Sequence, residues 1–179
     1  MKEFTLHELR FPIGEFVPPS QYSPKLIEKW TDEIDLLPKQ LIEETMHLSD
    51  EQLDTPYRPE GWTLRQVVHH IADSHINSFV RFKLALTEDN PTIKPYWEER
   101  WAKLPDYAMP IHSSLMLITS LHARWVHLIE CFSSDDLLRT YYHPESERNF
   151  SLRYAIALYA WHGKHHLAQI QSLKKRMGW

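Results

Sequence analysis

The stretch Trp161–Gln169, with the sequence WHGKHHLAQ, contains two histidines four residues apart in a segment with helical apolar periodicity. On an α-helix this spacing places two side chains one above the other on the same face. His162 and His166 are therefore positioned to bind one divalent metal ion together. Two imidazoles do not complete such a site, so we expect a third ligand from elsewhere in the chain. The best candidates are His69 and His70, far upstream.

Composition is that of an ordinary globular protein. The 179 residues are 42% hydrophobic and 25% charged, which is consistent with one domain over residues 1–179. The net charge is −4 and no block of basic residues is present, so the sequence does not favour nucleic-acid binding. No apolar run is long enough for a membrane span, and the N-terminus lacks the apolar core of a signal peptide.

The single cysteine, Cys131, follows an apolar helical pattern and is expected to be a small core residue. It has no partner for an intrachain disulfide, which favours a reduced, cytoplasmic location. One cysteine also excludes a thiolate-rich zinc site.

Four segments have the apolar periodicity of long helices. They are expected at about residues 24–48, 64–87, 113–132 and 152–177. Ser23, Thr63 and Ser151 are good N-cap residues, and Gln66 completes a capping box with Thr63. Pro38 should kink or split the first helix, because proline lacks the N–H that bonds one turn back, and we expect one bent helix to about residue 48.

The segments between these helices are rich in proline. Residues 1–22 are expected to form an extended arm, and residues 88–111 a long loop with a short helix at 96–103. The economical architecture is an all-α four-helix bundle with long crossover loops and an extended N-terminal arm.

Helical periodicity also indicates which histidines face inward, because an α-helix turns by roughly 100° per residue. On the last helix, His162 and His166 lie at one edge of the apolar stripe, with Gln169 below them. His165 lies roughly 100° away from His166 and is expected further toward solvent. A helical histidine pair that binds no metal is the alternative.

On the second long helix, His69 and His70 lie on opposite edges of the apolar stripe. His70 shares its edge with polar residues, whereas the edge of His69 is less polar, which gives a mild preference for His70. His75 lies in the middle of the stripe and remains an alternative third ligand. A hydrogen-bonded core residue is, however, the more common role for a histidine in that position. The other histidines are assigned to the surface or to packing.

The segment 61–73 (GWTLRQVVHHIAD), together with His162 and His166, resembles the signature of the DinB/YfiT-like superfamily. In that family a Trp-Ser/Thr pair opens a helix and a metal-binding histidine follows eight residues after the Trp, here His70. Residues 54–58, 81–88 and 176–179 resemble the YfiT-type branch of metal-dependent hydrolases, which is related to bacillithiol transferases.

This resemblance implies a four-helix bundle of unusual connectivity that forms a cytoplasmic homodimer. It also implies a site in which His70, His162 and His166 hold one divalent ion, zinc or nickel.

Three neutral imidazoles leave a coordination position open for water or substrate. A metal held in this way activates water for hydrolysis of a small-molecule substrate, or binds and deprotonates a thiol for transfer to an electrophile. The same ligands serve both a hydrolase and a bacillithiol S-transferase. A metal-binding stress protein without enzymatic activity is a third hypothesis.

No carboxylate is an obvious general base, because Asp73 points off the face of His70. Asn77 and Gln169 are candidates to hydrogen-bond the ligands. Arg81 is a candidate to contact an anionic substrate group.

Overall fold

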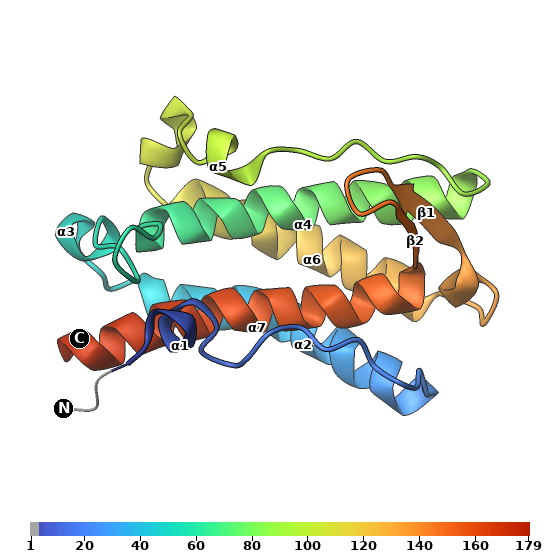
Figure 1. Ribbon diagram of the computed structural model, residues 1–179, viewed down its shortest axis with the longest axis horizontal. Coiled ribbons are helices and arrows are strands. Elements are labelled where there is room, and N and C mark those ends of the chain that lie inside the picture. Colours follow the sequence, from blue (N-terminus) through green and yellow to red (C-terminus); the bar gives the residue numbers. More distant parts are fainter. Residues whose placement is uncertain (1–3) are drawn as a thin grey trace.

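Four long helices form the body of the molecule in the computed structural model, which describes residues 4–179 (Figure 1). They are α2 (Pro24–Thr45), α4 (Leu64–Thr87), α6 (His112–Glu130) and α7 (Leu152–Met177). The main contacts are α2 with α6, α6 with α4, α4 with α7, and α7 with α2. The predicted all-α four-helix bundle is confirmed. Because α2 and α4 are diagonal, as are α6 and α7, the chain needs long crossovers.

The long helices begin where the sequence predicts. Thr63 accepts a hydrogen bond from the backbone N–H of Gln66 at 3.1 Å, and the Gln66 side chain accepts one from the N–H of Thr63 at 3.0 Å. This capping box satisfies donors that the first turn leaves free. Ser23 and Ser151 cap α2 and α7 by a single hydrogen bond each, which their hydroxyl oxygens accept from the backbone N–H of Leu26 and of Tyr154. These caps fix the register of the inward-facing residues on each helix.

Short elements fill the connections. They are α3 (Asp50–Leu53), α5 (Glu98–Trp101), two 3₁₀ turns at Pro105–Ala108 and Asp136–Leu138, and the antiparallel strands β1 (Thr140–His143) and β2 (Arg148–Ser151). The hairpin was not predicted. Neither was α1 (Leu6–Arg10), which interrupts the predicted extended arm because Thr5 and Glu8 form a capping box. Residues 1–3 of that arm lie outside the described part.

Pro38 does not split the first long helix. α2 is continuous through this residue, and Pro38 is buried. Its missing N–H would have bonded to the carbonyl of Ile34, four residues earlier. That carbonyl is therefore left without its helical donor, and its partner is described below.

Cys131 is exposed where α6 ends, so its predicted core position is wrong. The apolar pattern continues past the last helical turn, although the backbone no longer follows the helical path. Within residues 4–179, no helix has both the length and the apolar character needed to cross a membrane.

The apolar core consists of two clusters, one around Trp125 and Phe82 and the other around Leu37 and Ile71. On α4 and on α7, each cluster occupies a different half of the helix. Buried histidines lie at or near the junction of the two halves: His75 on α4 and His166 on α7 lie between them, and His70 lies within the stretch of α4 that the second cluster occupies. A polar layer thus crosses the middle of an apolar bundle.

Gly163 lets α7 approach α2 closely at this level. A Cβ atom added here would lie 2.5 Å from the Cδ2 atom of Leu37, which is almost fully buried. The contact explains a glycine in a helix interior, where alanine would normally be favoured by about 1 kcal/mol.

We expect Gly163→Ala to lower the free energy of unfolding by about 1–2 kcal/mol, because overpacking outweighs the gain in helix propensity. Urea denaturation of the metal-free protein measures this loss. In a Leu37→Ala background the clash is removed, so the same substitution should become neutral or stabilising. An equal loss in both backgrounds would contradict the proposed contact.

Candidate metal centre

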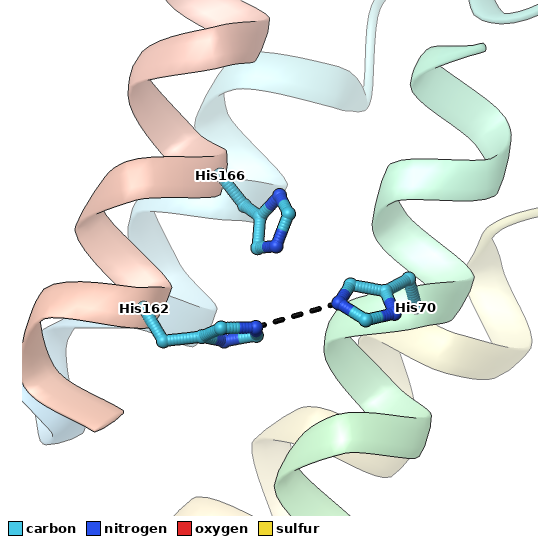
Figure 2. A group of neighbouring side chains, drawn as sticks. All are labelled: His70, His162 and His166. Carbon is cyan, nitrogen blue, oxygen red and sulfur yellow. Dashed lines mark hydrogen bonds between the residues drawn. The ribbon is translucent and has the colours of Figure 1, made fainter. Parts of the chain in front are cut away.

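Three histidines from two helices meet inside the bundle (Figure 2). His70 comes from α4, and His162 and His166 come from α7. Each offers a ring nitrogen, and these nitrogens lie within 4.8 Å of one another. The Nε2 atoms of His70 and His162 are 3.4 Å apart. The structure therefore brings together the three residues that the sequence selects.

Burial keeps these rings uncharged. Desolvation is the largest influence on all three, and it lowers the pKa of His70, His162 and His166 well below the ordinary value. The neighbouring imidazoles lower it further, because each would repel a second positive charge. A neutral imidazole offers the lone pair that a divalent ion needs. The donor set and its spacing thus fit a divalent metal ion.

Trp62 forms one wall of this cluster. Its ring centroid lies 4.5 Å from that of His70 and 6.5 Å from that of His166, nearly parallel to the latter. Trp62 immediately precedes the cap of α4. The helix start and the cluster are thereby packed together, which gives a physical reason for the spacing between this tryptophan and His70.

Gln169 orients His166. The Nδ1 of His166 lies 2.9 Å from the side-chain oxygen of Gln169, which can only accept, so Nδ1 carries the proton and donates. The amide of Gln169 in turn donates to the carbonyl of Arg10 at 2.8 Å and to the Nε2 of His165 at 3.0 Å. This arrangement leaves the Nε2 of His166 unprotonated. The predicted contact between Gln169 and a site histidine is present.

Asn77 and Arg81 are not beside the cluster. The Asn77 amide donates to the carbonyl of Asp73 on its own helix at 2.8 Å, and Arg81 is buried further along α4. They share the edge of His70, but the helix rises 1.5 Å per residue, so they lie roughly 10 and 16 Å along the axis. A face analysis ignores axial distance, so it groups these two residues with His70 although they lie further along the helix. Asp73 points away, as expected, and accepts from the Tyr107 hydroxyl at 2.7 Å.

His165 is buried, contrary to the expectation that it faces solvent. The N-terminal arm covers this face of α7, and the His165 ring packs against Phe11 and Trp161. Burial lowers the pKa of His165 to about 4. His165 is not one of the three clustered histidines, in agreement with the face analysis.

His69 and His75 also have structural roles. The ring nitrogens of His69 contact the Ser114 hydroxyl of α6 at 2.7 Å and the carbonyl of Met109, just before α6, at 3.0 Å. His75 is a hydrogen-bonded core residue, as the sequence favours, and its partners are His122 and His162. The importance of His122 was missed, because no pattern within α6 reveals which residue of α4 it faces.

A pocket of about 510 Å³ lies next to the cluster. Besides the three histidines, its lining includes side chains of both charges and several aromatic rings: Arg10, Arg58, Glu98, Glu99, Tyr57 and Trp161. The arm, the loop before α4 and α5 supply most of these residues. The histidine cluster is therefore accessible to a small molecule.

Known proteins are similar to this one in sequence and in structure. The model of the DinB superfamily matches residues 33–170, and this protein belongs to that superfamily. Proteins of Bacillus cereus and Bacillus mycoides, each named "Putative metal-dependent hydrolase", are 52% identical over 174 residues. Each alignment covers 97% of this chain and all of the relative.

One solved structure is also closely similar. It is that of YfiT from Bacillus subtilis, described as "a probable metal-dependent hydrolase with an unusual four-helix bundle topology". The TM-score is 0.94 at 44% sequence identity, and the match covers 96% of this chain and 99% of YfiT.

The buried imidazoles predict a dependence of stability on pH. Burial lowers the pKa of His122 to about 4, whereas a histidine in an unfolded chain has a pKa of about 6.5. Between these values the unfolded state binds more protons, so stability is complete above about pH 6.5 and falls as the pH approaches 4. Each such group contributes a slope of up to about 1.4 kcal/mol per pH unit.

Urea denaturation of the metal-free protein across this pH range measures the slope. His122→Asn keeps an N–H for the carbonyl that His122 contacts but removes the titrating ring, so its slope should be shallower by up to one proton. Identical slopes for the two proteins would show that His122 does not contribute.

Proposed function

We propose that this protein is a hydrolase of small molecules in which His70, His162 and His166 hold one divalent ion, zinc or nickel. The observation that carries the proposal is the approach of three neutral ring nitrogens within 4.8 Å beside an open pocket. Structural zinc sites are closed by four protein ligands, whereas catalytic sites use three and keep a position for water. When bound, such an ion supplies the Lewis acidity that activates water near neutral pH.

The residues around the cluster have separable tasks in this proposal. Gln169 holds the His166 ring with its Nε2 free, and Trp62 packs against two of the rings. Arg10 and Arg58 at the pocket offer cations to a polar substrate, and Glu98 and Glu99 offer anions. A substrate with both charges would be complemented by such a lining. We also propose that the protein acts as a homodimer, as the family resemblance implies.

The metal ligands are tested by metal content. We expect purified protein to contain about one divalent ion per chain, and His70→Ala to lose most of it, because two imidazoles bind much more weakly than three. Inductively coupled plasma mass spectrometry gives the stoichiometry and identifies the metal.

The neighbouring His69→Asn is a matched control. It alters a buried histidine on the same helix turn but outside the cluster, so metal content should be retained. Circular dichroism establishes that both variants are folded. Unchanged metal content in folded His70→Ala would rule out the proposed ligand set.

The reaction is tested with chromogenic esters and amides. We expect hydrolysis that is abolished by a chelator, restored by zinc or nickel, and reduced at least a hundredfold in His162→Ala. In parallel, thiols including bacillithiol are incubated with a model electrophile. Metal-dependent conjugation without hydrolysis would replace the hydrolase proposal with the thiol transferase, and neither activity in the metal-loaded protein would favour a non-enzymatic role.

A further inference from the structure

A row of buried rings connects the cluster to the opposite side of the bundle. The Nδ1 of His162 lies 3.1 Å from the Nε2 of His75, whose Nδ1 lies 2.8 Å from the Nε2 of His122. The Nδ1 of His122 lies 2.6 Å from the carbonyl oxygen of Ile34. The row thus passes through all four long helices, from α7 through α4 and α6 to α2.

The final carbonyl gives this row a direction. A carbonyl oxygen can only accept, so the Nδ1 of His122 must carry a proton. A neutral imidazole has one N–H, which leaves the Nε2 of His122 as an acceptor for His75. The same reasoning makes the Nε2 of His75 an acceptor for His162. His162 must then hold its proton on Nδ1, and its Nε2 is left with a bare lone pair.

That lone pair is on the nitrogen that faces the cluster. The Nε2 of His162 is the atom 3.4 Å from the Nε2 of His70. The series of hydrogen bonds that begins at the Ile34 carbonyl on α2 therefore fixes His162 in the tautomer that a metal ligand requires.

Pro38 explains why the carbonyl of Ile34 is available to the row of histidine rings. In a regular helix the carbonyl of Ile34 would accept from the N–H of residue 38, but proline has none. The carbonyl is thus freed to accept from His122 without competition from its own helix. A residue that is unfavourable in a helix interior thus serves to orient side chains on α6, α4 and α7.

The surroundings leave the rings few alternatives. His75 is 0% exposed and His122 is 1% exposed. The rings of Trp125 and Tyr159 pack edge-on against His75, and Trp125 also packs edge-on against His122. A second proton on either ring would bury a positive charge among these aromatic side chains, so both rings stay neutral and each carries one proton. Reversing the tautomer of His75 alone would set two N–H groups against each other on one side of the ring and two lone pairs on the other, which is unfavourable in a buried site.

We propose that His75 and His122 are positioning residues that fix the tautomer of His162 for metal binding. The tautomer assignment stands on its own, and only its use for a metal rests on the proposed function. Partners of this kind typically change metal affinity 10- to 100-fold when they are removed.

The tautomers are measured directly in metal-free wild-type protein. Long-range ¹H–¹⁵N correlation spectra distinguish a protonated Nδ1 from a protonated Nε2 in each ring, with assignments from single-histidine variants. We expect Nδ1–H and a bare Nε2 in His122, His75 and His162. A protonated Nε2 on His162 would overturn the proposal whether or not the protein binds metal.

A variant pair tests the consequence for affinity. His75→Gln keeps a carbonyl oxygen that can accept from His162, whereas His75→Leu removes the acceptor. Zinc competition with a chromophoric chelator should give a 10- to 100-fold weaker Kd for the leucine variant and a Kd within about threefold of wild type for the glutamine variant. Phe82→Leu, a core substitution elsewhere on α4, should leave the Kd unchanged.

The outcomes are separable. Equal weakening in the two His75 variants, or weakening in neither, would show that the acceptor is not what matters and would overturn the proposal. If His75→Leu does not fold, the wild-type spectra still decide it. Absence of zinc binding by wild type would instead refute the proposed function, with the tautomer result unaffected.

Discussion

The burial of uncharged imidazoles between two apolar clusters is the constraint on which this structure depends. A buried polar nitrogen without a partner costs free energy, so every ring in such a layer must find a donor, an acceptor or an ion. His122 and His75 meet this requirement through one another and through Ile34. At the last ring, His162, the inward Nε2 has only a long contact of 3.4 Å with the Nε2 of His70, and the buried Nδ1 of His70 has no hydrogen-bond partner within the described residues. Hydrogen bonding is thus incomplete where the three histidines meet, which is the place suited to a metal.

The four-helix bundle and the histidine pair on α7 are predictable because their signals are local, whereas periodicity gives only a mild preference for His70 and the family resemblance decides it. A capping box fixes where α4 begins, and the i, i+4 spacing places His162 and His166 on one face. The errors arise where several elements interact. Burial of His165 depends on an arm far away in sequence, and the role of His122 depends on the relative heights of α6 and α4. Neither relation is encoded in the periodicity of a single helix.

The N-terminal arm is part of the site as well as a cover for it. Gln169 contacts His166 through one end of its amide and the Arg10 carbonyl through the other. Any shift of α1 therefore changes the environment of a clustered histidine through a single side chain. Arg10 and Phe11 also line the pocket, so the same segment shapes the space in which a substrate would lie.

The distribution of the three histidines along the chain affects when the site can form. His162 and His166 lie on one helix and come together as soon as α7 does, but His70 is 92 positions away from His162. Those three rings meet only when α4 docks against α7, and the row behind them needs α6 and α2 as well. The complete site thus exists only in the assembled bundle. A chain in which α4 has not docked against α7 presents only the helical pair His162 and His166.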